Sequence, residues 1–413
     1  MEVRHSRTSI LPSSGRKMAE ATNYLTHLEC SKLSCGKTHS AEVEQHLCDC
    51  GSILLARYDL ARIASEVPRK RISSRPWNEG LWRYAELLPV ADPADRVSLG
   101  EGATPLLPLD WLSDELGIQV WVKDEGLNPT GTFKARGAAV GVSRAKQLGA
   151  STIGLPTAGN AGAAWAAYGA RAGLDVVVAM PKDAPPLTQQ EVKLYGARLH
   201  LVDGLISDAG IWVGAQIREH GWYDASTFKE PYRLEGKKTL GLEIAEQLAW
   251  ESPDVILYPT GGGVGLLGLW KAFEELHTLG WTGADRPPPR LVVVQSTGCA
   301  PVVRAWESKA DATHFWEGAQ TIAAGLRVPS PLSGALMLRA LREMQGTAIA
   351  VDDAEIRAAV RELAQAGLWV CPEGAALLPA IRHLRASGWI GEGERVVLLN
   401  TGTGLLYPEV SNG

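Results

Sequence analysis

A lysine at the predicted start of a helix is the first residue placed to do chemistry. Lys134 follows a Pro-Thr-Gly turn that ends the strand-like segment 119–123. The positive end of a helix dipole disfavours an ammonium, so this placement lowers the pKa of the lysine and favours the neutral amine that forms a Schiff base. An ordinary surface lysine at a helix start has the same pattern. Lys134 is therefore a candidate catalytic residue, and the other segments of the chain must show whether a cofactor site surrounds it.

A turn of small residues after the strand-like segment 151–156 is a candidate anion site. Small side chains allow the backbone N–H groups of a helix N-terminus to surround a carboxylate. The amide of Asn160 can donate to a ring oxygen or simply cap the helix. The whole turn consists of Thr157, Ala158, Gly159, Asn160 and Ala161.

A glycine-rich turn after the segment 254–260 is the candidate phosphate site. It consists of Gly261, Gly262, Gly263, Val264 and Gly265. Glycines permit close backbone approach to a phosphate at a helix N-terminus. No Gly-Lys-Ser/Thr follows, which excludes a P-loop. Residues 263–268 also match G-x-G-x-x-G, but the next strand ends in Gln295 instead of the acid that binds a ribose, so an NAD-dependent oxidoreductase is kept only as an alternative.

The last strand-like segment, 395–401, ends in Thr401 and a Thr-Gly turn. A threonine hydroxyl can hydrogen-bond an unprotonated pyridine nitrogen, although a plain glycine-rich turn explains the same letters. The four segments together offer a Schiff-base lysine, an anion clamp, a phosphate site and a partner for a ring nitrogen. That combination predicts a pyridoxal 5'-phosphate site.

The elements that must position these residues alternate between short apolar strands and amphipathic helices. This alternation predicts an α/β fold with mainly parallel, twisted sheets, which bind ligands at the carboxyl ends of their strands. The strand-like segments are 119–123, 151–156, 175–181, 198–203, 254–260, 290–296 and 395–401.

Composition limits the class of protein. The 413 residues correspond to roughly two or three domains. The 41 Lys and Arg against 46 Asp and Glu give a net charge of −5, which argues against nucleic-acid or membrane-surface partners and favours a small-molecule substrate. Residues 1–18 are polar and lack the apolar core of a secretory signal, so we expect a disordered tail and a cytoplasmic enzyme.

Four cysteines lie close together near the N-terminus, in residues 19–62. Their spacing is Cys30-x4-Cys35-x12-Cys48-x-Cys50, whereas zinc ribbons favour C-x2-C pairs. We therefore assign no metal to the chain and keep these four thiols as the candidate ligands.

The chain after its N-terminal tail resembles the threonine synthase family, within the fold-type II, tryptophan synthase β-like pyridoxal-phosphate enzymes. The resemblance implies a ribbon-like cysteine module (19–62), a large cofactor-binding domain (63–139 and 246–413), a small mobile domain (140–245) and a homodimer. The matching segments are 99–109, 127–137, 158–174, 230–248, 259–273, 372–376 and 400–405.

The resemblance also implies a role for each candidate. Lys134 would hold the cofactor and then act as acid and base, and Asn160 would contact the ring hydroxyl. Residues 157–161 would bind the substrate carboxylate, residues 261–265 the cofactor phosphate, and Thr401 the pyridine nitrogen. Arg233 and Lys237 are the candidates for a phosphorylated substrate, with Lys238 and Thr239 beside them. The implied reaction is γ-elimination of phosphate from O-phospho-L-homoserine and β-addition of water to give L-threonine.

Several positions depart from the family pattern near the expected substrate phosphate. Thr227 and Phe228 stand where the family has Asn-Ser, and the C-terminal loop ends in Leu-Leu-Tyr (405–407) where Leu-Lys is common. These changes keep open a second enzyme class, a β-elimination or β-replacement enzyme such as a serine/threonine dehydratase or a cysteate synthase, acting through an aminoacrylate. A regulatory protein that uses the cysteine module as its interaction surface is a further alternative, in which Lys134 has no role.

Overall fold

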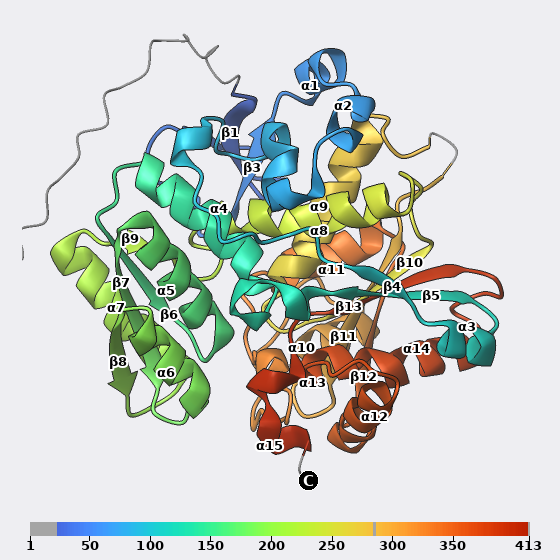
Figure 1. Cartoon of the computed structure of the whole chain (residues 1–413). Helices are drawn as coiled ribbons and strands as arrows, with labels where there is room; N and C mark the ends of the chain where they lie inside the picture. The colour runs from blue at the N-terminus through green and yellow to red at the C-terminus, as the bar shows by residue number, and fades with distance from the viewer. Residues whose placement is uncertain (1–22, 284–285, 412–413) are drawn as a thin grey trace, which may run out of the picture.

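The computed structural model describes residues 23–283 and 286–411 and contains three sheets. Figure 1 shows the four-stranded sheet and its helices on one side, the six-stranded sheet on the other, and the N-terminal module above them. The predicted tail, residues 1–18, lies outside the described residues. No helix in the described ranges is both long enough and apolar enough to cross a membrane.

The six-stranded sheet has the order β12-β11-β10-β13-β5-β4 and is parallel except for its edge strand β4. Its inner strands are buried on both faces, which explains their continuous apolar sequences. The strands are β4 (Leu106–Pro108), β5 (Gln119–Asp124), β10 (Val255–Pro259), β11 (Arg290–Ser296), β12 (Thr347–Val351) and β13 (Arg395–Asn400).

The four-stranded sheet is parallel throughout, with the order β8-β7-β6-β9. Its strands are β6 (Thr152–Pro156), β7 (Asp175–Pro181), β8 (Arg198–Val202) and β9 (Tyr223–Asp224). Three helices follow these strands in sequence and lie against the sheet in Figure 1: α5 (Asn160–Ala172), α6 (Pro186–Leu194) and α7 (Ile206–His220). All seven predicted strands are confirmed, and the α/β class with them. In these two sheets, strands β4, β9 and β12 were not predicted.

Besides α5, which begins at Asn160, three helices carry candidate residues: α4 (Lys134–Gln147), α8 (Arg233–Gln247) and α9 (Val264–Thr278). Glycines set how closely they approach. A Cβ at Gly236 would lie 2.0 Å from the Arg136 carbonyl oxygen of α4, and one at Gly268 would lie 2.8 Å from the Lys237 carbonyl carbon of α8. Helix α8 can therefore pack between α4 and α9 only with glycine at these contacts.

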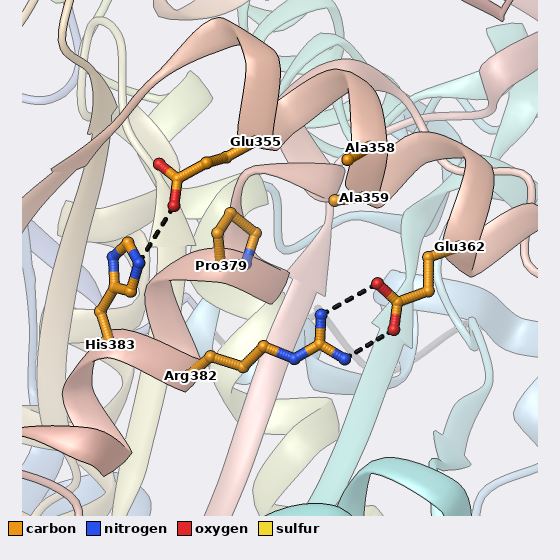
Figure 2. Close-up of a pocket in the computed structure, with 7 residues that line it drawn as sticks. All are labelled: Glu355, Ala358, Ala359, Glu362, Pro379, Arg382 and His383. Atoms are coloured by element: carbon orange, nitrogen blue, oxygen red, sulfur yellow. Dashed lines mark hydrogen bonds and ion pairs between the residues drawn. The ribbon is translucent and has the colours of Figure 1, made fainter.

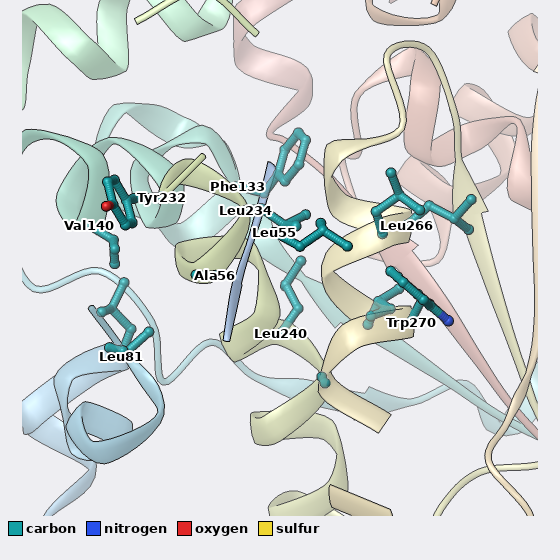
Figure 3. Close-up of a cluster of buried hydrophobic side chains, with 14 of the residues drawn as sticks. Leu55, Ala56, Leu81, Phe133, Val140, Tyr232, Leu234, Leu240, Leu266 and Trp270 are labelled. Carbon is teal, nitrogen blue, oxygen red and sulfur yellow. The ribbon is translucent and has the colours of Figure 1, made fainter. Parts of the chain in front are cut away.

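The N-terminal module is a three-stranded antiparallel sheet, with β1 (Leu25–Cys30) between β2 (Thr38–His39) and β3 (Leu54–Tyr58). Leu54 and Leu55 are fully buried. Figure 3 shows Leu55 and Ala56 among side chains of α8 and α9, such as Leu240 and Leu266, so the module shares the main hydrophobic core.

The remaining α-helices of the described residues include one, α13, that is fully buried. They are α1 (Leu60–Glu66), α2 (Arg69–Ser73), α3 (Asp110–Leu116), α10 (Pro301–Glu307), α11 (Gly334–Glu343), α12 (Asp353–Gln365), α13 (Pro372–Ala375), α14 (Leu377–Ala386) and α15 (Pro408–Ser411).

The glycine contact between α8 and α4 gives a stability prediction. Gly236→Ala is expected to lower the free energy of unfolding by about 2 kcal/mol, because the new methyl group meets backbone atoms that cannot rotate away. The matched control is Gly210→Ala in α7, where a Cβ meets nothing within 4 Å and helix propensity should add about 0.5–1 kcal/mol. Thermal unfolding midpoints of the two variants should move in opposite directions. A Gly236→Ala midpoint equal to or above that of the parent contradicts the packing argument.

Candidate active site

The topology brings three of the four predicted segments to one edge of the six-stranded sheet. Strands β10, β13 and β5 are parallel neighbours, so the turns that follow their carboxyl ends lie side by side. The backbone N–H of Phe133 donates to the Thr401 carbonyl oxygen at 3.0 Å, which joins the lysine turn directly to the last turn.

Lys134 is the first residue of α4 and is half-buried. Its Nζ lies 4.0 Å from the centroid of the Phe133 ring. Burial lowers the pKa of Lys134 to about 8, and the Arg233 charge acts in the same direction against the opposing effect of Glu373. The lowered pKa raises the fraction of this amine that is neutral and nucleophilic near neutral pH, as formation of a Schiff base requires.

A buried ion network fixes α4 one half-turn beyond the lysine. The guanidinium of Arg136 lies between two carboxylates, with Nε 2.6 Å from Glu125 Oε2 and Nη1 2.7 Å from Glu243 Oε1. Lys123 Nζ also contacts Glu243 Oε2, at 2.7 Å. Burial opposes ionisation of Glu243, but the Arg136 and Lys123 charges hold its pKa well below the usual range. The network joins β5, α4 and α8 next to Lys134.

The glycine turn forms a close-packed cradle at the start of α9. A Cβ at Gly261 would lie 2.1 Å from the Gly325 carbonyl oxygen, and one at Gly265 would lie 2.0 Å from the Tyr258 hydroxyl. Gly263 has a φ of +80°, which favours glycine. A Cβ at Gly262, by contrast, meets only Thr227 Cγ2 at 3.9 Å. The turn therefore excludes side chains while presenting helix N-terminal N–H groups, an arrangement that suits a phosphate.

The small-residue turn lies at the other sheet, between β6 and α5. The Gly159 N–H donates to Thr157 Oγ1 at 3.0 Å, and nothing lies within 4 Å of a Cβ built on Gly159. Ala158 and Ala161 are half-buried on either side. Asn160 Nδ2 donates to the Tyr407 hydroxyl at 2.7 Å. This bond joins the N-terminus of α5 to the segment after β13, so the fourth turn faces the other three.

Thr401 follows β13 and is buried beside two residues that received no role from the sequence. Its Oγ1 lies 3.5 Å from Cys371 Sγ, and Cys371 is also buried. Glu373 Oε1 accepts the Gly325 N–H at 2.6 Å, while its Oε2 is buried and has no partner among the described residues. Glu373 lies in a matched segment, 372–376, but nothing local to its sequence marks it as a neighbour of Lys134.

The candidate substrate cations separate into two groups. Arg233 Nη1 donates to Thr227 Oγ1 at 2.9 Å, and its buried Nε has no hydrogen-bond partner among the described residues. Lys237 Nζ donates to the Phe133 carbonyl oxygen, beside Lys134. Both cations are therefore near the site.

Lys238 and Thr239 face away from the lysine. Lys238 Nζ lies 2.6 Å from Glu235 Oε2 and 2.8 Å from Glu275 Oε2, inside the α8–α9 contact. Thr239 Oγ1 accepts from Arg136 Nη1 at 2.9 Å. Both belong to structural networks, and neither lysine of the pair 237–238 is solvated, because both are buried.

A surface pocket elsewhere offers no competing site. Figure 2 shows it between α12 and α14, lined by side chains that already pair with one another. Arg382 binds Glu362 at 2.6 Å, and His383 binds Glu355 at 3.0 Å. Among the described residues no lysine lines this pocket, so it offers no amine comparable to that of Lys134.

The residues present fit pyridoxal phosphate. They supply a lysine whose pKa is lowered, a turn in which close packing requires glycine at positions 261 and 265, and a buried threonine hydroxyl. A buried carboxylate oxygen of Glu373 without a hydrogen-bond partner among the described residues lies nearby. The lysine would bind an aldehyde, the turn a phosphate and the threonine a ring nitrogen.

Comparisons with known proteins agree with this fit. Residues 97–402 match the family described as "Pyridoxal-phosphate dependent enzyme". The chain is 36% identical over 382 residues to the threonine synthase of Methanocaldococcus jannaschii, covering 92% of this chain and 93% of that protein. It is 36% identical over 387 residues to the threonine synthase of Methanosarcina acetivorans, covering 93% of each. The solved structure of the processed form of threonine deaminase isoform 2 from Solanum lycopersicum superposes with a TM-score of 0.65 at 20% identity, over 75% of this chain and 81% of that one.

The pKa of Lys134 gives a pH prediction. When the cofactor-free chain is mixed with pyridoxal phosphate, the rate at which the visible absorption band grows should rise with pH and reach half its maximum near pH 8, because only the neutral amine attacks. Lys134→Ala should form no band, whereas Lys193→Ala, at an exposed position of α6, should match the parent. A half-maximal pH near the ordinary lysine value of about 10.4 would contradict the effect of burial.

Proposed function

This chain belongs to the pyridoxal-phosphate dependent enzymes and, within them, to the threonine synthase family, and we propose that it converts O-phospho-L-homoserine and water into L-threonine and phosphate. The observation that supports this substrate is the pair of buried basic side chains, Arg233 and Lys237, beside Lys134. Burial and the Lys134 charge lower the pKa of Lys237 well below its usual range, and a bound anion would favour its charged form. Residues 261–265 would hold the cofactor phosphate, which would leave these two basic groups for a second anion.

Pyridoxal phosphate, when bound, supplies an electron-accepting ring for the removal of protons from substrate carbons. Residues 261–265 would hold its phosphate through backbone N–H groups, and the Thr401 hydroxyl would donate to its ring nitrogen. Asn160, oriented by Tyr407, would contact the ring oxygen.

Lys134 is the proton carrier of this proposal. Its amine has a pKa of about 8, so it can both accept and donate a proton near neutral pH. The Arg136 network holds the first turn of α4, and with it the lysine backbone, in a fixed position. Burial around Lys134 limits the access of water until the step that consumes it.

Arg233 would bind the leaving phosphate. Thr227 and the Ala225 carbonyl oxygen already accept from its two terminal nitrogens, which orients the guanidinium. The buried Nε has no hydrogen-bond partner among the described residues and lies 4.0 Å from Glu230 Oε2. The N-terminus of α5, residues 157–161, would bind the amino-acid carboxylate.

The β-elimination alternative is favoured by one contact. Thr227 stands where the family has a polar pair, and its hydroxyl is already bonded to Arg233 instead of being open to a substrate. A serine or threonine substrate needs no phosphate site. A dehydratase remains the second candidate for that reason.

We further propose that residues 140–245 move as a small domain over the site and that the enzyme is a cytoplasmic homodimer. In the first proposal the moving part would be the four-stranded sheet with α5, α6 and α7, because the Gly236 and Gly268 contacts fix α8 against α4 and α9. The second rests on the family resemblance alone.

A product assay distinguishes the two reactions. With O-phospho-L-homoserine, the holoenzyme should release phosphate and form L-threonine in equal amounts, and serine or threonine should release no ammonia. Lys134→Ala should lower kcat by about 1,000-fold or more, since the acid–base group is lost. Ammonia and a 2-oxoacid from serine, with no phosphate from phosphohomoserine, would establish the dehydratase instead.

The role of Arg233 is tested by Arg233→Gln. Loss of a charged hydrogen bond to phosphate should raise KM for phosphohomoserine about 10- to 100-fold. The visible band should remain, which reports that the cofactor site still forms. Arg198→Gln, at an exposed position of β8, is the matched control and should leave KM unchanged. An unaltered KM in Arg233→Gln would place the substrate phosphate elsewhere.

A further inference from the structure

The four N-terminal cysteines form a compact thiol cluster at one end of the module sheet. Their Sγ atoms all lie within 4.8 Å of one another, and all four thiols are free. Cys30 Sγ and Cys50 Sγ are 3.5 Å apart, and Cys35 Sγ and Cys48 Sγ are 3.8 Å apart. These separations are too long for disulfides, whose sulfurs lie about 2.05 Å apart.

The separations suit a metal instead. Four sulfurs placed tetrahedrally around zinc at about 2.3 Å have edges of about 3.8 Å. The two Sγ–Sγ distances, 3.5 and 3.8 Å, are close to that edge length. Sequence spacing did not indicate a metal, because neither gap between paired cysteines has the usual two residues.

Two tight turns explain how the unusual spacing still builds the cluster. The Cys35 N–H donates to the Lys32 carbonyl oxygen at 2.9 Å, and the Gly51 N–H donates to the Cys48 carbonyl oxygen at 2.7 Å. Gly36 and Gly51, which follow Cys35 and Cys50, have φ values of +61° and +80°. Each turn therefore folds its thiols back toward the end of β1, where Cys30 lies.

We propose that Cys30, Cys35, Cys48 and Cys50 bind one structural zinc ion. All four positions are taken by thiolates, so the site is closed and keeps no coordination position for a substrate or a water molecule. Among divalent ions without redox chemistry, zinc is the one that four thiolate ligands favour.

The ion would hold the module against the enzyme body. The loop after Cys30 accepts a hydrogen bond from Arg339 of α11 through the Ser31 carbonyl oxygen, at 2.7 Å. The loop between the two turns accepts one from Tyr232, next to α8, through the Ala41 carbonyl oxygen, at 3.2 Å. Loss of the ion frees both loops, so it should lower the stability of the whole chain and not only that of the module.

The test is elemental analysis of the full-length holoenzyme purified without added metal. We expect about one zinc per chain, released together with four titratable thiols when a mercurial reagent is added. The double variant Cys35→Ser/Cys48→Ser should lose the zinc and unfold at a temperature lower by about 5 °C or more. Cys299→Ser removes a buried thiol far from the cluster in sequence and should keep the zinc.

The double variant could fold poorly, so a conservative replacement accompanies it. Cys50→His, at the exposed ligand, should retain zinc because histidine replaces cysteine in such sites, while Cys50→Ala should bind it less tightly. The proposal is overturned by a parent protein that holds no zinc, by iron in its place, by disulfides within the cluster, or by zinc that persists in the double variant.

Discussion

The guanidinium of Arg136 holds together the parts on which the site depends. Glu125 follows β5, Arg136 lies in α4 and Glu243 lies in α8, so one set of ion pairs joins three segments far apart in the sequence. Removing one partner of a buried pair leaves an uncompensated charge and costs about 3–5 kcal/mol, which makes this arrangement intolerant of single changes. Lys134 precedes Arg136 by two residues, so the position of the amine follows from the position of the guanidinium. The close α4–α8 contact at Gly236 belongs to the same constraint.

Much of the scaffold could be predicted because its signals are local. A turn that leads from a strand into a helix is recognisable from a short run of glycine and threonine next to an apolar segment. Such runs identified the turns at Lys134, Thr157, Gly261 and Thr401. Strand β12 was missed because its residues are mostly half-buried at the edge of the sheet and carry a weaker apolar pattern. Tyr407 and Glu373 were missed because only tertiary contacts bring them to the site.

The segment 237–239 shows why a motif alone cannot assign roles. Adjacent residues of a helix point about 100° apart. Lys237 accordingly reaches the Phe133 carbonyl oxygen beside Lys134, Lys238 reaches Glu235 and Glu275, and Thr239 reaches Arg136. Three consecutive residues thus serve a candidate binding site, the α8–α9 contact and the α4 network. The sequence of this segment does not show which side of the helix each residue faces.

The contact of Lys238 and Lys271 with the module has a consequence for how this chain evolves. The two ammonium groups share Glu235 and Glu275, and the Tyr58 ring of β3 covers them at 4.1 and 4.8 Å from its centroid. A gene that lost its first segment would expose these four charges and the apolar surface under Leu54 and Leu55 to water. The module is therefore not an interchangeable appendage: it and the two helices beneath it must be inherited, exchanged or lost together.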